Sequence, residues 1–95
     1  MITQMSEVAA ICLGVANCVL KGELTLEEFR SHWPLEADKD RLLWRFMHAV
    51  EHFLIDEDIR AKDPSYDVYQ RKVIASLATD VSKKYKVVRS GEIGG

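Results

Sequence analysis

The chain has 95 residues, of which 47% are hydrophobic and 29% are charged, and its formal net charge is −2 at pH 7. This length suits one small globular domain with a single core and is too short for two. We expect the domain to span residues 1–88 and residues 89–95 to form a flexible C-terminal tail. Because no block rich in Lys and Arg occurs before the C-terminal run KVVRSGEIGG, general nucleic-acid binding lacks its electrostatic footprint.

The cysteines and the apolar run over residues 8–20 indicate the cellular compartment. Cys12 and Cys18 lie six positions apart in one predicted helix, which separates them by about 9 Å along its axis. That separation is beyond the usual reach of a disulfide within a helix, so we expect thiols in a reducing cytosol. The apolar run lacks the preceding positive charge of a signal peptide and is too short to span a bilayer. The sequence therefore predicts a cytoplasmic protein that does not contact membranes.

The first predicted helix runs from about Ser6, a natural N-cap, to Lys21, with Gly22 as its C-terminal stop. Apolar residues recur every three or four positions and define one buried face, which comprises Met5, Val8, Cys12, Val15 and Val19. We expect three further apolar side chains to widen that face, namely Ile11, Leu13 and Leu20.

The second predicted helix is short and spans about Leu26 to His32. Thr25 and Glu28 have the spacing of a capping box, in which each side chain bonds the other residue's backbone amide. The pair Trp33-Pro34 ends the segment, because proline disfavours the helical conformation in the residue before it.

The third predicted helix begins near Asp38, an N-cap, and presents a regular apolar stripe made by Leu42, Leu43, Phe46, Met47, Val50, Phe53 and Leu54. The opposite, polar face carries Arg41, Arg45, His48 and His52, so we expect the histidines to point away from the core.

The fourth predicted helix starts at Asp63-Pro64, as cap and first helical position, and continues to about Lys84. Its inner face comprises Tyr66, Gln70, Val73, Ile74, Leu77 and Val81, and we expect Gln70 to bond another buried group. No alternating strand pattern occurs. The sequence predicts an all-α fold, a compact antiparallel helical bundle of three long helices and one short helix, packed around Val15, Phe46, Val50, Phe53, Val73 and Leu77.

The string His48-Ala49-Val50-Glu51-His52 matches HxxEH, in which two histidines bind zinc and the glutamate activates water. Arg41 and Arg45 on the same face would repel a divalent cation, and no further ligand is obvious. A weaker metal site made by His48, His52 and Asp56 would also be possible if the third helix extended that far. We prefer an exposed histidine pair and expect neither a metal nor a cofactor.

The acidic stretch after Ile55 is the stronger candidate for a binding site. It comprises Asp56, Glu57, Asp58, Asp63 and Asp67, with Tyr66 and Tyr69 beside it. In one interpretation Asp63 caps the fourth helix, Asp67 lies at the positive end of that helix, and Arg60 and Lys62 screen the remaining charge. However, Asp56, Glu57 and Asp58 at the C-terminal end of the third helix would oppose its macrodipole, and residues that break a local rule are candidates for function.

Trp44 falls at the edge of the apolar stripe of the third helix. Partly exposed aromatic side chains are frequent binding anchors. The alternative is that Trp44 covers Trp33 or the second helix.

Three segments carry a family resemblance: LKGELTLEEFRSHWP, the long predicted helix that ends in HFLIDEDIR, and the closing helix after Asp63-Pro64. Over residues 17–82 they resemble small helical bacterial immunity proteins of the colicin D immunity class. The resemblance implies an inhibitor of a toxic, tRNA-cleaving nuclease, whose acidic residues occupy the basic cleft of the toxin in place of substrate phosphates. On this chain it points to Asp56, Glu57, Asp58, Asp63 and Asp67, with Tyr66 or Tyr69 as an aromatic anchor.

We therefore expect a non-catalytic binding protein that neutralises a basic toxin domain through an acidic surface, as a monomer or homodimer. Two alternatives remain open. One is a self-associating regulatory or structural module with a dimer face around Trp44. The other is a metal-dependent hydrolase that uses His48, Glu51 and His52.

Overall fold

The computed structural model describes residues 4–87, and the predicted tail lies outside them. The described part is helical, which confirms the all-α fold class. It contains long helices α1 (Met5–Leu20), α3 (Arg41–Ile55) and α5 (Pro64–Tyr85), short helices α2 (Leu26–His32) and α4 (Glu57–Lys62), and a 3-10 helix η1 (Leu35–Lys39). The prediction of a single short helix was wrong, because it missed both α4 and η1.

The beginning of α1 differs slightly from the prediction, whereas its end agrees. The N-cap is Gln4, which makes no side-chain cap, so Ser6 lies inside the first turn. At the other end Gly22 adopts a φ of 76°, a left-handed conformation that favours glycine. The amide of Gly22 donates to the carbonyl oxygen of Val19 over 3.0 Å and closes the last turn.

Helix α2 begins with the predicted capping box. The hydroxyl of Thr25 accepts from the amide of Glu28 over 3.1 Å, and the carboxylate of Glu28 accepts from the amide of Thr25 over 2.9 Å. Phe29 is buried and attaches this short helix to the core. Pro34 precedes η1, and η1 adds a short helical segment between α2 and α3.

The N-cap of α3 is Asp40 and not Asp38, because η1 occupies the preceding residues. One carboxylate oxygen of Asp40 accepts from the amides of Leu42 and Leu43, over 2.7 and 3.1 Å. The other oxygen accepts from Lys84 Nζ over 2.7 Å and from the hydroxyl of Tyr85. Asp40 is only 8% exposed, and it joins the first turn of α3 to the last turn of α5.

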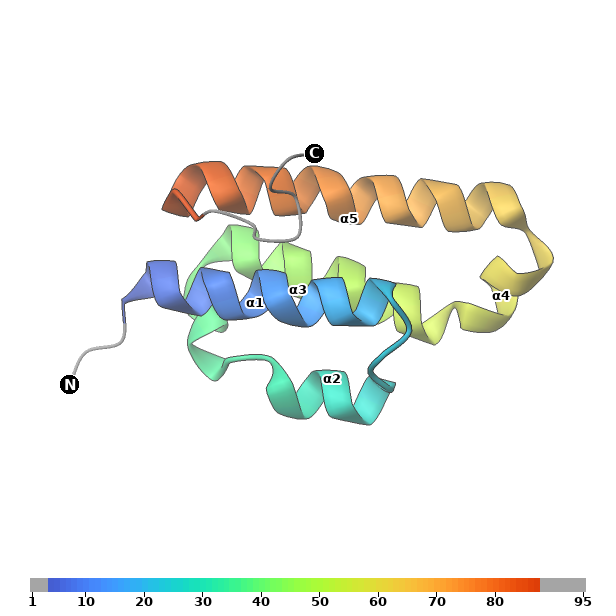
Figure 1. Cartoon of the computed structure of the whole chain (residues 1–95), viewed down its shortest axis with the longest axis horizontal. Coiled ribbons are helices and arrows are strands. Elements are labelled where there is room, and N and C mark those ends of the chain that lie inside the picture. Colours follow the sequence, from blue (N-terminus) through green and yellow to red (C-terminus); the bar gives the residue numbers. More distant parts are fainter. Residues whose placement is uncertain (1–3, 88–95) are drawn as a thin grey trace.

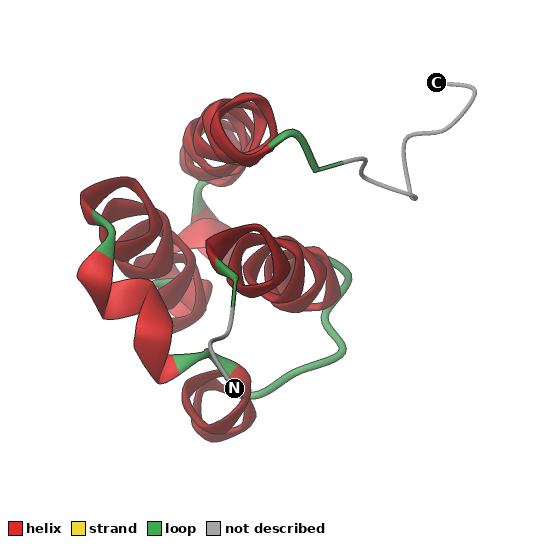
Figure 2. Ribbon diagram, turned by 90° about the vertical axis from the view of Figure 1, so that its left-hand side faces the viewer, coloured by secondary structure: helices red, strands yellow, loops and turns green. Residues whose placement is uncertain are grey.

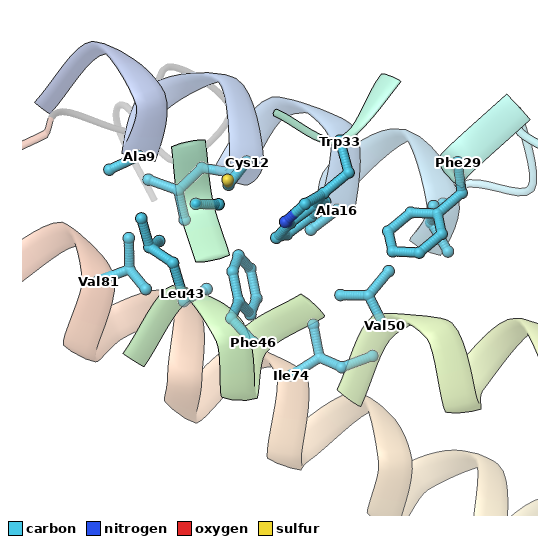
Figure 3. Packing of buried hydrophobic residues seen from close by; sticks show 14 of the residues in the cluster. Ala9, Cys12, Ala16, Phe29, Trp33, Leu43, Phe46, Val50, Ile74 and Val81 are labelled. Atoms are coloured by element: carbon cyan, nitrogen blue, oxygen red, sulfur yellow. The ribbon is translucent and has the colours of Figure 1, made fainter. Parts of the chain in front are cut away.

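The core lies between α1, α3 and α5, with α2 and η1 adding side chains from one side (Figure 3). Phe46 occupies its centre, and Trp33 packs between Phe46 and Phe29 at ring-centroid distances of 5.7 and 5.3 Å. Several predicted core residues are buried as expected, namely Phe46, Val50 and Phe53, whereas Val15, Val73 and Leu77 are only partly buried. Ile11 was wrongly placed on the inner face, since its side chain is 50% exposed.

The long helices lie side by side, and α1 and α3 run in the same direction while α5 runs in the opposite one (Figure 1). After α1, the short α2 carries the chain back toward the start of α3. Helix α4 forms the turn between α3 and α5. Viewed end-on, the helices surround a common centre (Figure 2). No helix within residues 4–87 is long and apolar enough to cross a membrane.

Candidate partner-binding corner

The predicted acidic residues gather where α3 gives way to α4 and α5. We call this region the corner, and it comprises Asp56, Glu57, Asp58, Asp63, Tyr66, Asp67 and Tyr69. Asp56 is the C-cap of α3 and also the residue that precedes α4. Glu57 and Asp58 lie in the first turn of α4, where the positive end of the helix dipole stabilises negative charge. The expectation that they oppose the dipole of α3 was therefore wrong, since it assumed that α3 continues through them.

Asp56 is held by two side chains of α5. One of its carboxylate oxygens accepts from the hydroxyl of Tyr66 over 2.7 Å and from the amide nitrogen of Gln70 over 3.0 Å. Gln70 is buried as predicted, but its partners, Asp56 and the hydroxyl of Tyr66, are only half-buried. The hydrogen bond to Asp56 and, to a smaller extent, burial raise the pKa of Tyr66 above its ordinary value of 10.0. This network fixes the ring of Tyr66 and the turn between α3 and α4.

Asp67 lies between two arginines. Its carboxylate accepts from Arg60 over 2.8 Å and from Arg71 over 3.0 Å. The hydrogen bond from Arg60, which has the largest effect, and that from Arg71 hold the pKa of Asp67 below its ordinary value of 3.8. The positive charges of the two arginines therefore offset the negative charge of Asp67, which adds little net charge to the surface.

The two arginines also cap the ends of two helices. Arg60 donates twice to the carbonyl oxygen of Phe53, over 3.0 and 2.7 Å, and its guanidinium lies 3.4 Å from the centroid of the Phe53 ring. Arg71 donates to the carbonyl oxygen of Leu20, over 3.2 Å. Both carbonyls are in the last turn of their helix, where intrahelical donors are lacking. The sequence pattern predicts only a screening role for Arg60 and no role for Arg71.

Asp63 is the N-cap of α5, as predicted. Its carboxylate accepts from the hydroxyl of Ser65 over 2.6 Å and from the amides of Ser65 and Tyr66. These bonds lower the pKa of Asp63 below its ordinary value of 3.8, and the bond from the Ser65 hydroxyl has the largest effect. By contrast, Glu57 and Asp58 are exposed and make no ion pair within residues 4–87.

The corner also exposes an aromatic side chain that packs on a neighbouring ring. Tyr69 is 62% exposed, and its ring stacks on that of Tyr66 with a centroid distance of 6.4 Å and an interplanar angle of 16°. Because Asp56 fixes Tyr66, it indirectly orients Tyr69. Exposed apolar side chains occur on all three elements of the corner: Ile55 on α3, Ile59 on α4 and Val68 on α5.

The HxxEH residues do not form one site. His48 packs against Trp44, with ring centroids 4.1 Å apart, and Glu51 accepts from Arg30 of α2 over 3.1 Å. His52 is exposed. Within residues 4–87, no group of three or more His, Cys, Asp and Glu side chains lies close enough to hold a metal ion.

Trp44 is 46% exposed. The aromatic pairs of Trp33 are with Phe29 and Phe46, and that of Trp44 is with His48, so the alternative in which Trp44 covers Trp33 or the second helix stays a prediction. Trp44 contacts a neighbour on its own helix and leaves much of its ring at the surface.

The corner thus combines internal ion pairs with a few unpaired acidic and aromatic groups at the surface. No family model, curated protein or solved structure matches this chain.

Proposed function

We propose that this chain is a non-catalytic, cytoplasmic binding protein whose corner holds a basic partner protein. The immunity resemblance suggests the class of that partner, a bacterial nuclease toxin that the bound chain would inhibit. The observation that carries the proposal is an exposed tyrosine, Tyr69, that stacks on Tyr66 in a corner where Glu57 and Asp58 make no ion pair with any residue the structure describes.

The aromatic group is suited to be the anchor. Tyrosine is enriched among the residues that dominate binding energy at protein interfaces. A side chain that already packs on a neighbour loses less conformational entropy on binding, and the ring of Tyr69 stacks on that of Tyr66. Asp56 and Tyr66 therefore act by positioning, and Tyr69 makes the contact.

The charges divide in the same way. Asp63 and Asp67 are bonded within the fold, so they shape the corner more than they attract a partner. Glu57 and Asp58 remain available to arginines and lysines of a basic surface. Complementary charges of this kind raise the association rate and favour the correct partner more than they raise affinity.

The experiment uses the protein encoded immediately upstream, whose toxin domain is purified and titrated with the whole chain by calorimetry. We expect a one-to-one complex that inhibits cleavage of tRNA and weakens between about 50 and about 500 mM salt. E57K/D58K and Y69A should each weaken binding by at least about tenfold, which corresponds to about 1.4 kcal/mol. Circular dichroism checks that both variants keep the fold.

The matched control is E27K/D80K, which changes the net charge of the chain by the same amount as E57K/D58K. Glu27 lies in the first turn of α2, as Glu57 does in α4, and Asp80 is exposed on α5. This variant should bind with unchanged affinity. If E57K/D58K and Y69A bind as tightly as the parent chain while folded, or if the upstream product does not bind, the proposal is wrong.

A further inference from the structure

The outer side of α3 carries an unpaired basic surface. We call it the basic face, and it comprises Arg41, Trp44, Arg45, His48 and His52. The spacing of three and four residues places these side chains on one side of the helix. Arg41, Arg45 and His52 are exposed, and His48 lies against Trp44.

No carboxylate within residues 4–87 pairs with either arginine of the basic face. Asp40, next to Arg41, accepts from Lys84, and Glu51, the acidic residue within α3, accepts from Arg30 of α2. Two permanent positive charges and a half-exposed tryptophan are thus available to an acidic surface. Aromatic and arginine side chains are both enriched at protein interfaces.

The same chain presents the complementary surface. The corner has unpaired carboxylates at Glu57 and Asp58 and an exposed aromatic ring at Tyr69. Arg41 and Arg45 lie about 16 Å or more along the helix axis from Asp56, whereas His52 adjoins the corner. In the described part of one molecule, residues 4–87, no ion pair joins the two surfaces.

We infer that the basic face of one copy of this chain binds the corner of a second copy, in a head-to-tail contact. Arg41 and Arg45 face Glu57 and Asp58, with Trp44 against Tyr69 in the centre. Because the two contacting surfaces differ, each bound pair leaves one basic face and one corner free, so further copies can add and the assembly grows beyond a dimer, as an open chain or a closed ring.

Charge favours a second copy over a nucleic acid. The chain as a whole is at −2, and the two arginines of the basic face neutralise too few phosphates for stable binding at physiological salt. The corner covered in this contact is the one proposed for the basic partner, so self-association and partner binding would compete. The contact itself does not depend on the existence of that partner.

The first experiment measures the mass of the whole chain by light scattering over a dilution series, at about 50 and about 500 mM salt. We expect the average mass to rise with concentration beyond that of a dimer at low salt and to fall at high salt. A monomer at every concentration, or a mass that stops at a dimer, would overturn the head-to-tail contact.

Charge reversal tests the pairing of the two surfaces. R41E/R45E and E57K/D58K should each be monomeric, because each places like charges opposite one another. An equal mixture of the two, or the quadruple variant R41E/R45E/E57K/D58K, restores opposite charges at every contact and should again form chains. The control E27K/D80K should behave as the parent chain does.

Two results would contradict the inference directly. One is a quadruple variant that stays monomeric while circular dichroism shows the parent fold. The other is binding of a labelled single-stranded oligonucleotide that is lost in R41E/R45E, with the parent chain monomeric throughout. That second result would assign the basic face to nucleic acid.

Discussion

At the scale of single residues, Arg60 of α4 joins the end of α3 to the start of α5 beside the corner. It is only 10% exposed and bonds the end of α3 and Asp67 of α5 while it stacks on Phe53. We expect R60A to lower the free energy of unfolding by about 2–3 kcal/mol, because hydrogen bonds to charged groups are lost and Phe53 O and Asp67 are left with fewer partners. Urea denaturation measures this change.

R60K separates charge from geometry. Lysine keeps the positive charge but has neither the planar fork nor the stacking surface, so R60K should recover less than half of the loss. The control is K62A, an exposed residue of the same helix, which should stay within about 0.5 kcal/mol of the parent. Equal stability of R60A and K62A would show that Arg60 does not hold the corner.

At the scale of elements, Asp40 couples α3 to α5 and should make stability depend on pH. Burial alone would raise the pKa of Asp40, but hydrogen bonds from Lys84 and from the amides of Leu43 and Leu42 outweigh it and lower the pKa below 3.8. A carboxylate with a lowered folded pKa stabilises the fold above its unfolded pKa, and this contribution is lost as the pH falls through the folded pKa. The parent chain should therefore exceed D40N in stability at about pH 7, and the difference should shrink below about pH 4.

Urea unfolding at several pH values measures the difference between the two proteins. Asp63 and Asp67 are present in both, so their own titration cancels to a first approximation. D80N is the control, and its difference from the parent should not vary with pH in the same way. A difference for D40N that stays constant down to about pH 3 would contradict the coupling.

The elements differ in how far local sequence determines them. The caps at Thr25 and Asp63 use bonds within three residues, and both were predicted correctly. Asp38 and Asp40 are equally good caps by local rules, and the choice depends on η1 and on partners 44 and 45 residues away. Helix α4 has six residues and none is buried, so it gives no apolar periodicity to detect.

The same reasoning applies to the corner. Its residues were all named from the sequence, and the cap by Asp63 followed from local spacing. The bonds from Tyr66 and Gln70 to Asp56 bridge 10 and 14 positions, and they depend on a helix that the pattern did not reveal. The division into bonded and unpaired carboxylates therefore required the structure.

At the scale of the whole molecule, one core joins α1, α3 and α5, and Phe46 lies at its centre. We expect F46A to lower the free energy of unfolding by about 3–5 kcal/mol, through lost burial and a cavity. That is a large share of the roughly 5–15 kcal/mol of an ordinary domain. Because the core is shared, circular dichroism and tryptophan fluorescence should report a single transition.

The control for this prediction is I11A. Because Ile11 is half exposed, this substitution should lower the free energy of unfolding by less than about 1 kcal/mol. Transitions that differ between the two signals would instead indicate that α2 or α5 unfolds separately from the remaining helices.

The unequal environments of the two tryptophans provide spectroscopic probes without a label. Trp33 is 7% exposed among core rings, and Trp44 is 46% exposed on the basic face. A soluble quencher such as iodide should therefore reach Trp44 first, and W44F should retain the blue-shifted emission of a buried indole. Emission from Trp33 then follows unfolding, while quenching of Trp44 follows the covering of the surface of α3, so one sample can report both processes.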